Sequence, residues 1–171
     1  KTAAWCLFLL TLVAAAGLDY PDPAERRAAV LELAKGGAPA SLAGLGKALR
    51  DDNAVVRRTA LRSLVSLGKP AAATLQGALA NEDGEVRAAA LRALQGLQAL
   101  TREQLAAALR DRDPAVRQAS AQILLDLKPY TDETRALLDL AAKDEAPAIR
   151  ELVAKAVWPY YKPTSLLRQR V

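Results

Sequence analysis

Apolar side chains recur along this chain at helical intervals, and the same arrangement returns several times. The apolar positions that follow Asn53 and those that follow Asp83 correspond one to one: Val56, Ala60, Leu61, Leu64 and Leu67, then Val86, Ala90, Leu91, Leu94 and Leu97. Intervals of three and four residues place such side chains on one face of an amphipathic helix. Each stretch therefore predicts a helix with one face committed to a core.

Five segments carry this pattern, and each opens where a helix should begin. They start 31, 30, 30 and 33 residues apart, at Asp22, Asn53, Asp83, Asp113 and Ala146. Aspartate and asparagine are good N-cap residues, and proline, found at positions 23, 114 and 147, favours the first helical position. An arginine lies four residues after each start, at Arg26, Arg57, Arg87, Arg117 and Arg150.

Shorter periodic stretches lie between these segments and predict partner helices. They read "SLAGLGKALR", "AAATLQGALA", "TREQLAAALR" and "TDETRALLDLAAK", and Gly36, Gly37, Gly68 and Pro70 mark breaks between units. Each unit is then a hairpin of two helices in about 30 residues, which is too small to bury its own apolar face. Neighbouring hairpins must stack, so the sequence predicts an all-α fold.

The residue types in the chain argue against catalysis. Histidine is absent, which removes the commonest general base and the commonest metal ligand. The sequence also offers no nucleophile beside a base, no metal-ligand cluster and no glycine-rich phosphate loop. We therefore expect a protein that is not an enzyme and has neither a cofactor nor a metal ion.

The phrase "LRDRDPAVRQASAQIL" and its sister phrases resemble HEAT repeats, in the short form named for phycobilisome lyases. The resemblance spans roughly residues 22 to 160, and the fifth segment departs from it because Ala146 replaces the capping aspartate. It implies a right-handed α-solenoid of about five short helical hairpins. It also implies a scaffold for binding other proteins, with the second helix of each hairpin on the concave side.

Residues 1–17 form a separate unit in which Lys1 is followed by a short apolar run. One cation, an apolar stretch and small residues match a secretory signal peptide, so we expect export to the periplasm or the medium. A membrane anchor formed by residues 1–18 is the alternative, although an apolar run of about 16 residues is short for crossing a bilayer. The remaining chain divides into a solenoid at 18–160 and a C-terminal tail at 161–171.

The repeated arginine follows a β-branched residue in four of the five units, and it faces the positive end of its helix dipole, which is unfavourable unless carboxylates lie nearby. The turns supply such carboxylates, among them Asp51, Asp83 and Asp144. We therefore expect a structural ladder in which turn carboxylates pair with Arg57, Arg87, Arg117 and Arg150.

A second set of cations lies five or nine residues after each helix start, where side chains point away from the apolar face. It forms a basic ridge of Arg27, Arg58, Arg62 and Arg92, with Lys155 at the corresponding position of the last segment. The ridge predicts a binding surface for an acidic protein, and an ordinary solvated surface is the alternative. The aromatic residues near the C-terminus either dock a partner or cap the last repeat: Trp158, Tyr160 and Tyr161.

These observations favour an exported interaction scaffold or accessory subunit that binds another protein. The net charge of +5 keeps a nucleic-acid binder as an alternative, but the ridge weakens toward Gln118, Gln122 and Glu151. A lyase of the phycobilisome type is a lesser alternative, because no histidine is present and Cys6 lies in the apolar run. Contact with a membrane is expected only if the N-terminal segment is retained.

Overall fold

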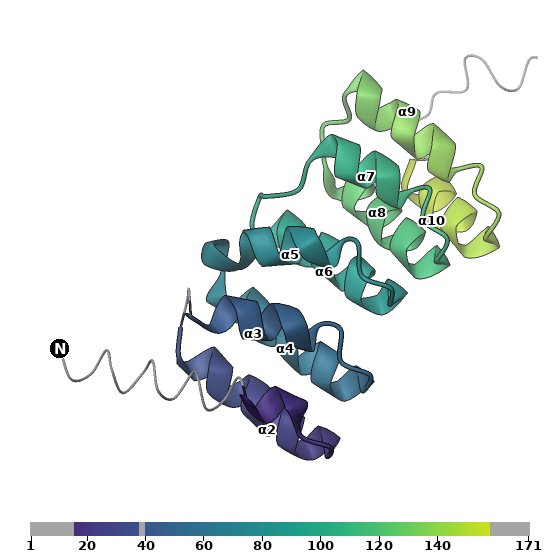
Figure 1. Ribbon diagram of the computed structural model, residues 1–171. Helices are drawn as coiled ribbons and strands as arrows, with labels where there is room; N and C mark the ends of the chain where they lie inside the picture. Colours follow the sequence, from purple (N-terminus) through teal and green to yellow (C-terminus); the bar gives the residue numbers. More distant parts are fainter. Residues whose placement is uncertain (1–15, 38–39, 158–171) are drawn as a thin grey trace, which may run out of the picture. The chain divides into compact units, whose positions relative to one another are not determined.

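The computed structural model describes residues 16–37 and 40–157, and within these residues all regular structure is helical (Figure 1). This result confirms the all-α class and its repeated hairpins. The elements are η1 (Gly17–Asp19), α2 (Pro23–Lys35), α3 (Ala40–Ala48), α4 (Ala54–Leu67), η2 (Lys69–Ala71), α5 (Ala72–Ala78), α6 (Gly84–Gly96), α7 (Arg102–Ala108), α8 (Pro114–Asp126), α9 (Asp132–Ala141) and α10 (Pro147–Val157).

Four of the helices begin at the N-cap residues that the sequence indicates. The side chains of Asp22, Asn53, Asp83 and Asp113 each accept a hydrogen bond from the amide two residues later, at 2.8–2.9 Å. These bonds satisfy amides that have no partner inside the helix. The caps therefore set the start of α2, α4, α6 and α8 locally, and the start of each helix fixes where its arginine lies.

The first compact unit extends to Thr101 and contains α2 to α6 in two layers. Helices α2, α4 and α6 pack side by side in one layer, while α3 and α5 pack against each other and against this row. The core between the layers is built from Val30, Leu33, Leu45, Val56, Leu64, Leu75 and Leu94. Gly44 permits the close approach of α3 to α2, because a Cβ atom there would lie 2.8 Å from Cδ1 of Leu33.

The second compact unit begins at Arg102 and contains the hairpins α7–α8 and α9–α10. Helix α8 packs against α7, α9 and α10. Ser120 of α8 is fully buried, and its hydroxyl donates a hydrogen bond of 2.8 Å to the carbonyl oxygen of Leu105 in α7. This bond links the two helices. The buried apolar residues of this unit include Leu105, Val116, Leu124, Leu138 and Ile149.

No helix among the described residues is long and apolar enough to cross a membrane. The expected signal or anchor segment falls almost wholly outside the described residues. Its last position, Gly17, is buried in η1, where an added Cβ atom would lie 2.8 Å from that of Ala29.

Candidate functional site

Every arginine of the repeated column lies against the turn that precedes its own helix. In each case Nη1 donates to the carbonyl oxygens six and five residues earlier in the chain. The pairs are Arg26 with Tyr20 and Pro21, Arg57 with Asp51 and Asp52, Arg87 with Asn81 and Glu82, Arg117 with Asp111 and Arg112, and Arg150 with Asp144 and Glu145. This clamp holds the guanidinium plane in the same way in all five units.

The opposite edge of the guanidinium reaches the turn of the following unit. Arg57 Nε donates to Oδ2 of Asp83 at 2.7 Å, and Arg117 Nε donates to Oδ2 of Asp144 at 2.8 Å. Arg26, which the expected ladder did not include, makes the same contact with Asp51 at 2.7 Å and also pairs with the adjacent aspartate. These three arginines thus connect α2, α4 and α8 to the turn of the following unit.

The ladder differs from expectation at Arg150, which is exposed and contacts only backbone carbonyl oxygens among the described residues. The carboxylate of Asp144 is engaged by Arg117, and the described chain contains no further turn after α10. Arg87 is buried, and its Nη1 donates to the carbonyl oxygens of Asn81 and Glu82 at 2.7 and 2.9 Å.

Charge pairing lowers the pKa of the ladder carboxyls. The hydrogen bonds from Arg117 are the largest influence on Asp144 and hold its pKa below the ordinary value. For Asp51, partial burial by itself would raise the pKa, but the bonds donated by Arg26 and by the Asn53 amide outweigh it. In the folded protein, where the ladder aspartates are paired with their arginines, the ionised form of each carboxyl is therefore favoured.

The arginines of the basic ridge differ from those of the ladder in their exposure and in their interaction partners. Arg27 on α2, Arg58 and Arg62 on α4, and Arg92 on α6 are all exposed. Within the part of the chain that the structure describes, none of these four guanidinium groups pairs with a carboxylate. Helices α2, α4 and α6 lie in one row, so the four cations belong to one layer of the first unit.

The exposed row is interrupted at one position, and its arginines all belong to the first unit. Ala88, which the register assigns to the exposed row of α6, is buried. Lys155 belongs to the second compact unit and pairs with Glu151 one helical turn earlier, with Nζ 2.7 Å from Oε1. Unlike the four ridge arginines, Lys155 therefore has a carboxylate partner within its own unit.

Apolar side chains accompany the ridge on α4. Val55 and Val65 are each 46% exposed, and they share the helix face of Arg58 and Arg62. Leu31 on α2 is 43% exposed and lies four residues after Arg27. Exposed apolar side chains therefore lie beside cations that have no carboxylate partner among the described residues.

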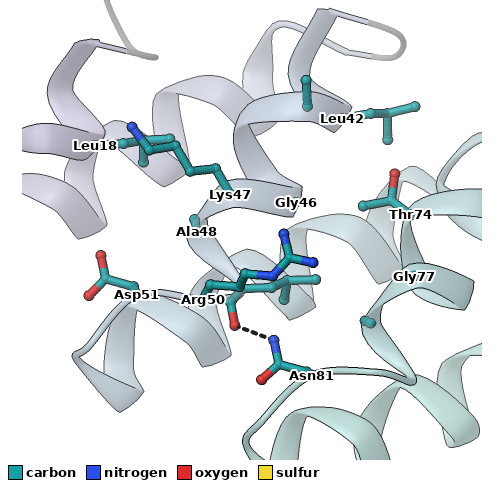
Figure 2. A pocket seen from close by; sticks show the side chains of 13 residues that line it. Leu18, Leu42, Gly46, Lys47, Ala48, Arg50, Asp51, Thr74, Gly77 and Asn81 are labelled. Carbon is teal, nitrogen blue, oxygen red and sulfur yellow. Dashed lines mark hydrogen bonds between the residues drawn. The ribbon is translucent and has the colours of Figure 1, made fainter.

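The other layer of the first unit carries a groove of about 680 Å³ that the sequence did not indicate (Figure 2). Figure 2 shows the Arg50 side chain beside the groove residues of α3 and α5, and a hydrogen bond of 2.8 Å from Asn81 to the Leu49 carbonyl oxygen closes one wall. Lys47 at the rim pairs with Asp19 at 2.6 Å. The available signal was small residues three positions apart, because Ala43 and Gly46 of α3 and Thr74 and Gly77 of α5 line this groove.

The described residues contain no group of three side chains that could hold a metal ion. Trp158, Tyr160 and Tyr161 lie outside the described residues, so the docking segment stays a prediction. A family model for HEAT repeats matches residues 11–95 and again residues 73–158. No curated protein matches the sequence.

Proposed function

Because the chain belongs to the HEAT-repeat family, whose members generally serve as scaffolds for protein–protein interaction, we propose that it is a non-enzymatic module that binds an acidic partner protein. The binding surface is the basic ridge of the first compact unit. The partner supplies carboxylates to Arg58, Arg62 and Arg92 and apolar side chains to the valines beside them.

The observation that carries this proposal is the division of the arginines into two classes. The ladder arginines Arg26, Arg57 and Arg117 are bound to carboxylates of the chain, and displacing them would expose buried charges. The ridge arginines have no such partners among the described residues, so a ligand can bind them without breaking an internal ion pair. Guanidinium groups recognise carboxylates in a bidentate geometry, which gives the surface its chemical preference.

The exposed valines favour a protein over a nucleic acid as the partner. Val55 and Val65 flank the two arginines of α4, and burying them would contribute roughly 25 cal/mol per Å² of apolar surface. A phosphate backbone offers little apolar surface that could pack against the valines. Proteins that bind phosphate backbones usually do so with denser stripes of lysine and arginine. An acidic protein surface with apolar residues among its carboxylates satisfies both parts of the ridge.

A quantitative capture experiment tests the proposal. The full chain and its Arg62→Glu/Arg92→Glu variant are immobilised, incubated with extract from the native source, and the bound proteins are compared by mass spectrometry. The matched control is Arg50→Glu/Lys69→Glu, which makes the same change in net charge at exposed positions of the first unit outside the ridge. We expect a protein that is retained by the wild type and the control and depleted at least tenfold on the ridge variant.

Three other outcomes contradict the proposal. Equal loss on both variants would mean that net charge alone attracts the partner. Loss only on the control would move the binding surface to the groove between α3 and α5. Salt-sensitive binding of arbitrary duplex DNA, abolished by the ridge variant, would replace the protein partner with a nucleic acid.

We also propose that the protein works outside the cytoplasm, on the basis of the apolar run after Lys1. N-terminal sequencing of the protein from its native source tests this, and a mature terminus near Gly17 or Leu18 is expected. Recovery of the uncleaved segment in a membrane fraction would favour the anchor instead.

A further inference from the structure

The last described helix, α10, carries an arginine whose surroundings are incomplete. Arg150 is held by the carbonyl oxygens of Asp144 and Glu145 at 2.8 and 2.9 Å, as every other arginine of the column is held by its own turn. In Arg26, Arg57 and Arg117 the edge that carries Nε then meets an aspartate of the following turn. Among the described residues no carboxylate meets this edge of Arg150.

Arg150 and a second residue on the same face of α10 are more exposed than their counterparts in other helices. Arg26 and Arg117 are buried, whereas Arg150 is exposed. Four residues later on the same helix face, Val30 of α2 and Ala121 of α8 are fully buried, whereas Ala154 of α10 is exposed. The side of α10 that carries Arg150 and Ala154 thus corresponds to the side that a following helix covers in α2 and α8.

Residues 158–171 do not supply the carboxylate that this face of α10 lacks. Residues 158–171, "WPYYKPTSLLRQRV", contain no aspartate or glutamate and add three cations. They could cover apolar surface, but they hold no acidic side chain to pair with the open guanidinium edge. The contacts inside the chain indicate what would fit, because Asp51 with Asp52 and Asp144 with Glu145 are adjacent acidic residues in the turn before a helix.

We propose that the face of α10 with Arg150 and Ala154 is a second docking surface, for a partner protein that presents two adjacent acidic residues in the turn before a helix. The acidic turn binds the Nε edge of Arg150, and the helix after it packs on Ala154. This surface belongs to the second compact unit and does not depend on the basic ridge.

A peptide titration tests the proposal with a defined probe. A fluorescent peptide of residues 141–157 carries the Asp144–Glu145 turn that Arg117 binds, and the matched control peptide carries Asp144→Asn and Glu145→Gln. Binding to the full chain is measured by fluorescence anisotropy. We expect saturable binding of the acidic peptide that weakens at least fivefold with the control peptide and with the Arg150→Gln protein.

A second protein variant keeps the test informative if Arg150→Gln disturbs the turn. Ala154→Glu changes an exposed helical position that makes no hydrogen bond through its side chain, and it places a like charge in front of the acidic peptide. This variant should melt at the wild-type temperature and bind the peptide at least fivefold more weakly. Wild-type affinity in a folded Ala154→Glu protein would overturn the proposal.

Four further results would also overturn it. The acidic and control peptides could bind equally, or neither could bind. The peptide could bind only after Trp158, Tyr160 and Tyr161 are replaced by alanine, which would mean that the chain's own tail occupies α10. Loss of peptide binding in Arg62→Glu/Arg92→Glu would place the peptide on the ridge, whereas unchanged binding there leaves the two proposals separate.

Discussion

Arg117 holds Asp144, 27 positions later in the chain, through two parallel hydrogen bonds: Nε to Oδ2 at 2.8 Å and Nη2 to Oδ1 at 3.1 Å. Only 8% and 6% of these two side chains is exposed. The pair connects the start of α8 to the turn before α10, and Asp144 also caps that turn by accepting from the amide of Ala146. One carboxylate therefore fixes both a local turn and the packing of successive hairpins.

Removing one partner of this pair should destabilise the second unit strongly. In Arg117→Ala the carboxylate of Asp144 loses its buried partner, and we expect the free energy of unfolding to fall by about 3 kcal/mol. Urea denaturation followed by circular dichroism measures the change. The control is Gln118→Ala, an exposed neighbour that should stay within about 0.5 kcal/mol of wild type. Similar losses for the two variants would contradict a structural role for the pair.

The ladder should make the protein sensitive to acid. The pKa values of Asp51, Asp83 and Asp144 are lowered in the folded protein, so the unfolded chain binds more protons in the acidic range. Their stabilisation is complete above the unfolded carboxyl pKa of about 3.9 and is lost as the pH falls through the lower folded values. Urea unfolding between pH 6 and pH 2 should show a shallower loss in Asp144→Asn than in wild type. Parallel curves would exclude this linkage.

Two positions of α6, Leu94 and Arg92, should differ strongly in how much stability is lost on truncation. Leu94 is fully buried, and Leu94→Ala should cost about 2 to 5 kcal/mol by leaving a cavity in the core. Arg92 is exposed and without a carboxylate partner among the described residues, so Arg92→Ala should change stability by less than about 0.5 kcal/mol. Thermal and urea unfolding of both variants measure the difference, and equal losses would show that the register of α6 is wrong.

Two helical glycines should differ in the effect of an added methyl group. Alanine at position 44 would place Cβ 2.8 Å from the Leu33 side chain, whereas no atom lies within 4 Å of a Cβ at position 77. Both changes gain helix propensity, up to about 1 kcal/mol, but only the first adds overpacking of about 1 to 3 kcal/mol. Gly77→Ala should therefore be the more stable variant in urea unfolding, and the reverse order would contradict the close contact of α2 with α3.

Local chemistry made most of the fold predictable from the sequence. The caps at Asp22, Asn53, Asp83 and Asp113 act within two residues of themselves, so their effect can be read without knowing the tertiary structure. The apolar positions after each cap repeat at the same offsets, which fixed the buried faces. The pairing of Arg57 with a turn carboxylate followed from its place in the first turn of a helix.

The features that escaped prediction depend on packing between segments. Arg26 pairs with Asp51 although it lacks the β-branched residue before it, because the clamp uses backbone oxygens that every turn offers. Ala88 is buried although its register resembles that of Arg58, since burial depends on neighbours that the register does not specify. The groove between α3 and α5 arises from the spacing of two helices, and only small residues such as Gly46 indicated it.

In the proposed function, the ladder arginines stabilise the fold while the ridge arginines bind the partner. This difference is tested most directly by the affinity of the captured partner for two variants of α4. Arg57→Gln and Arg62→Gln each remove one charge from positions five residues apart, one paired with Asp83 and one exposed. In titration calorimetry on folded protein, we predict that Arg62→Gln weakens binding at least about threefold, while Arg57→Gln keeps the wild-type affinity within about twofold. Weaker binding by Arg57→Gln with unchanged affinity for Arg62→Gln would contradict the account.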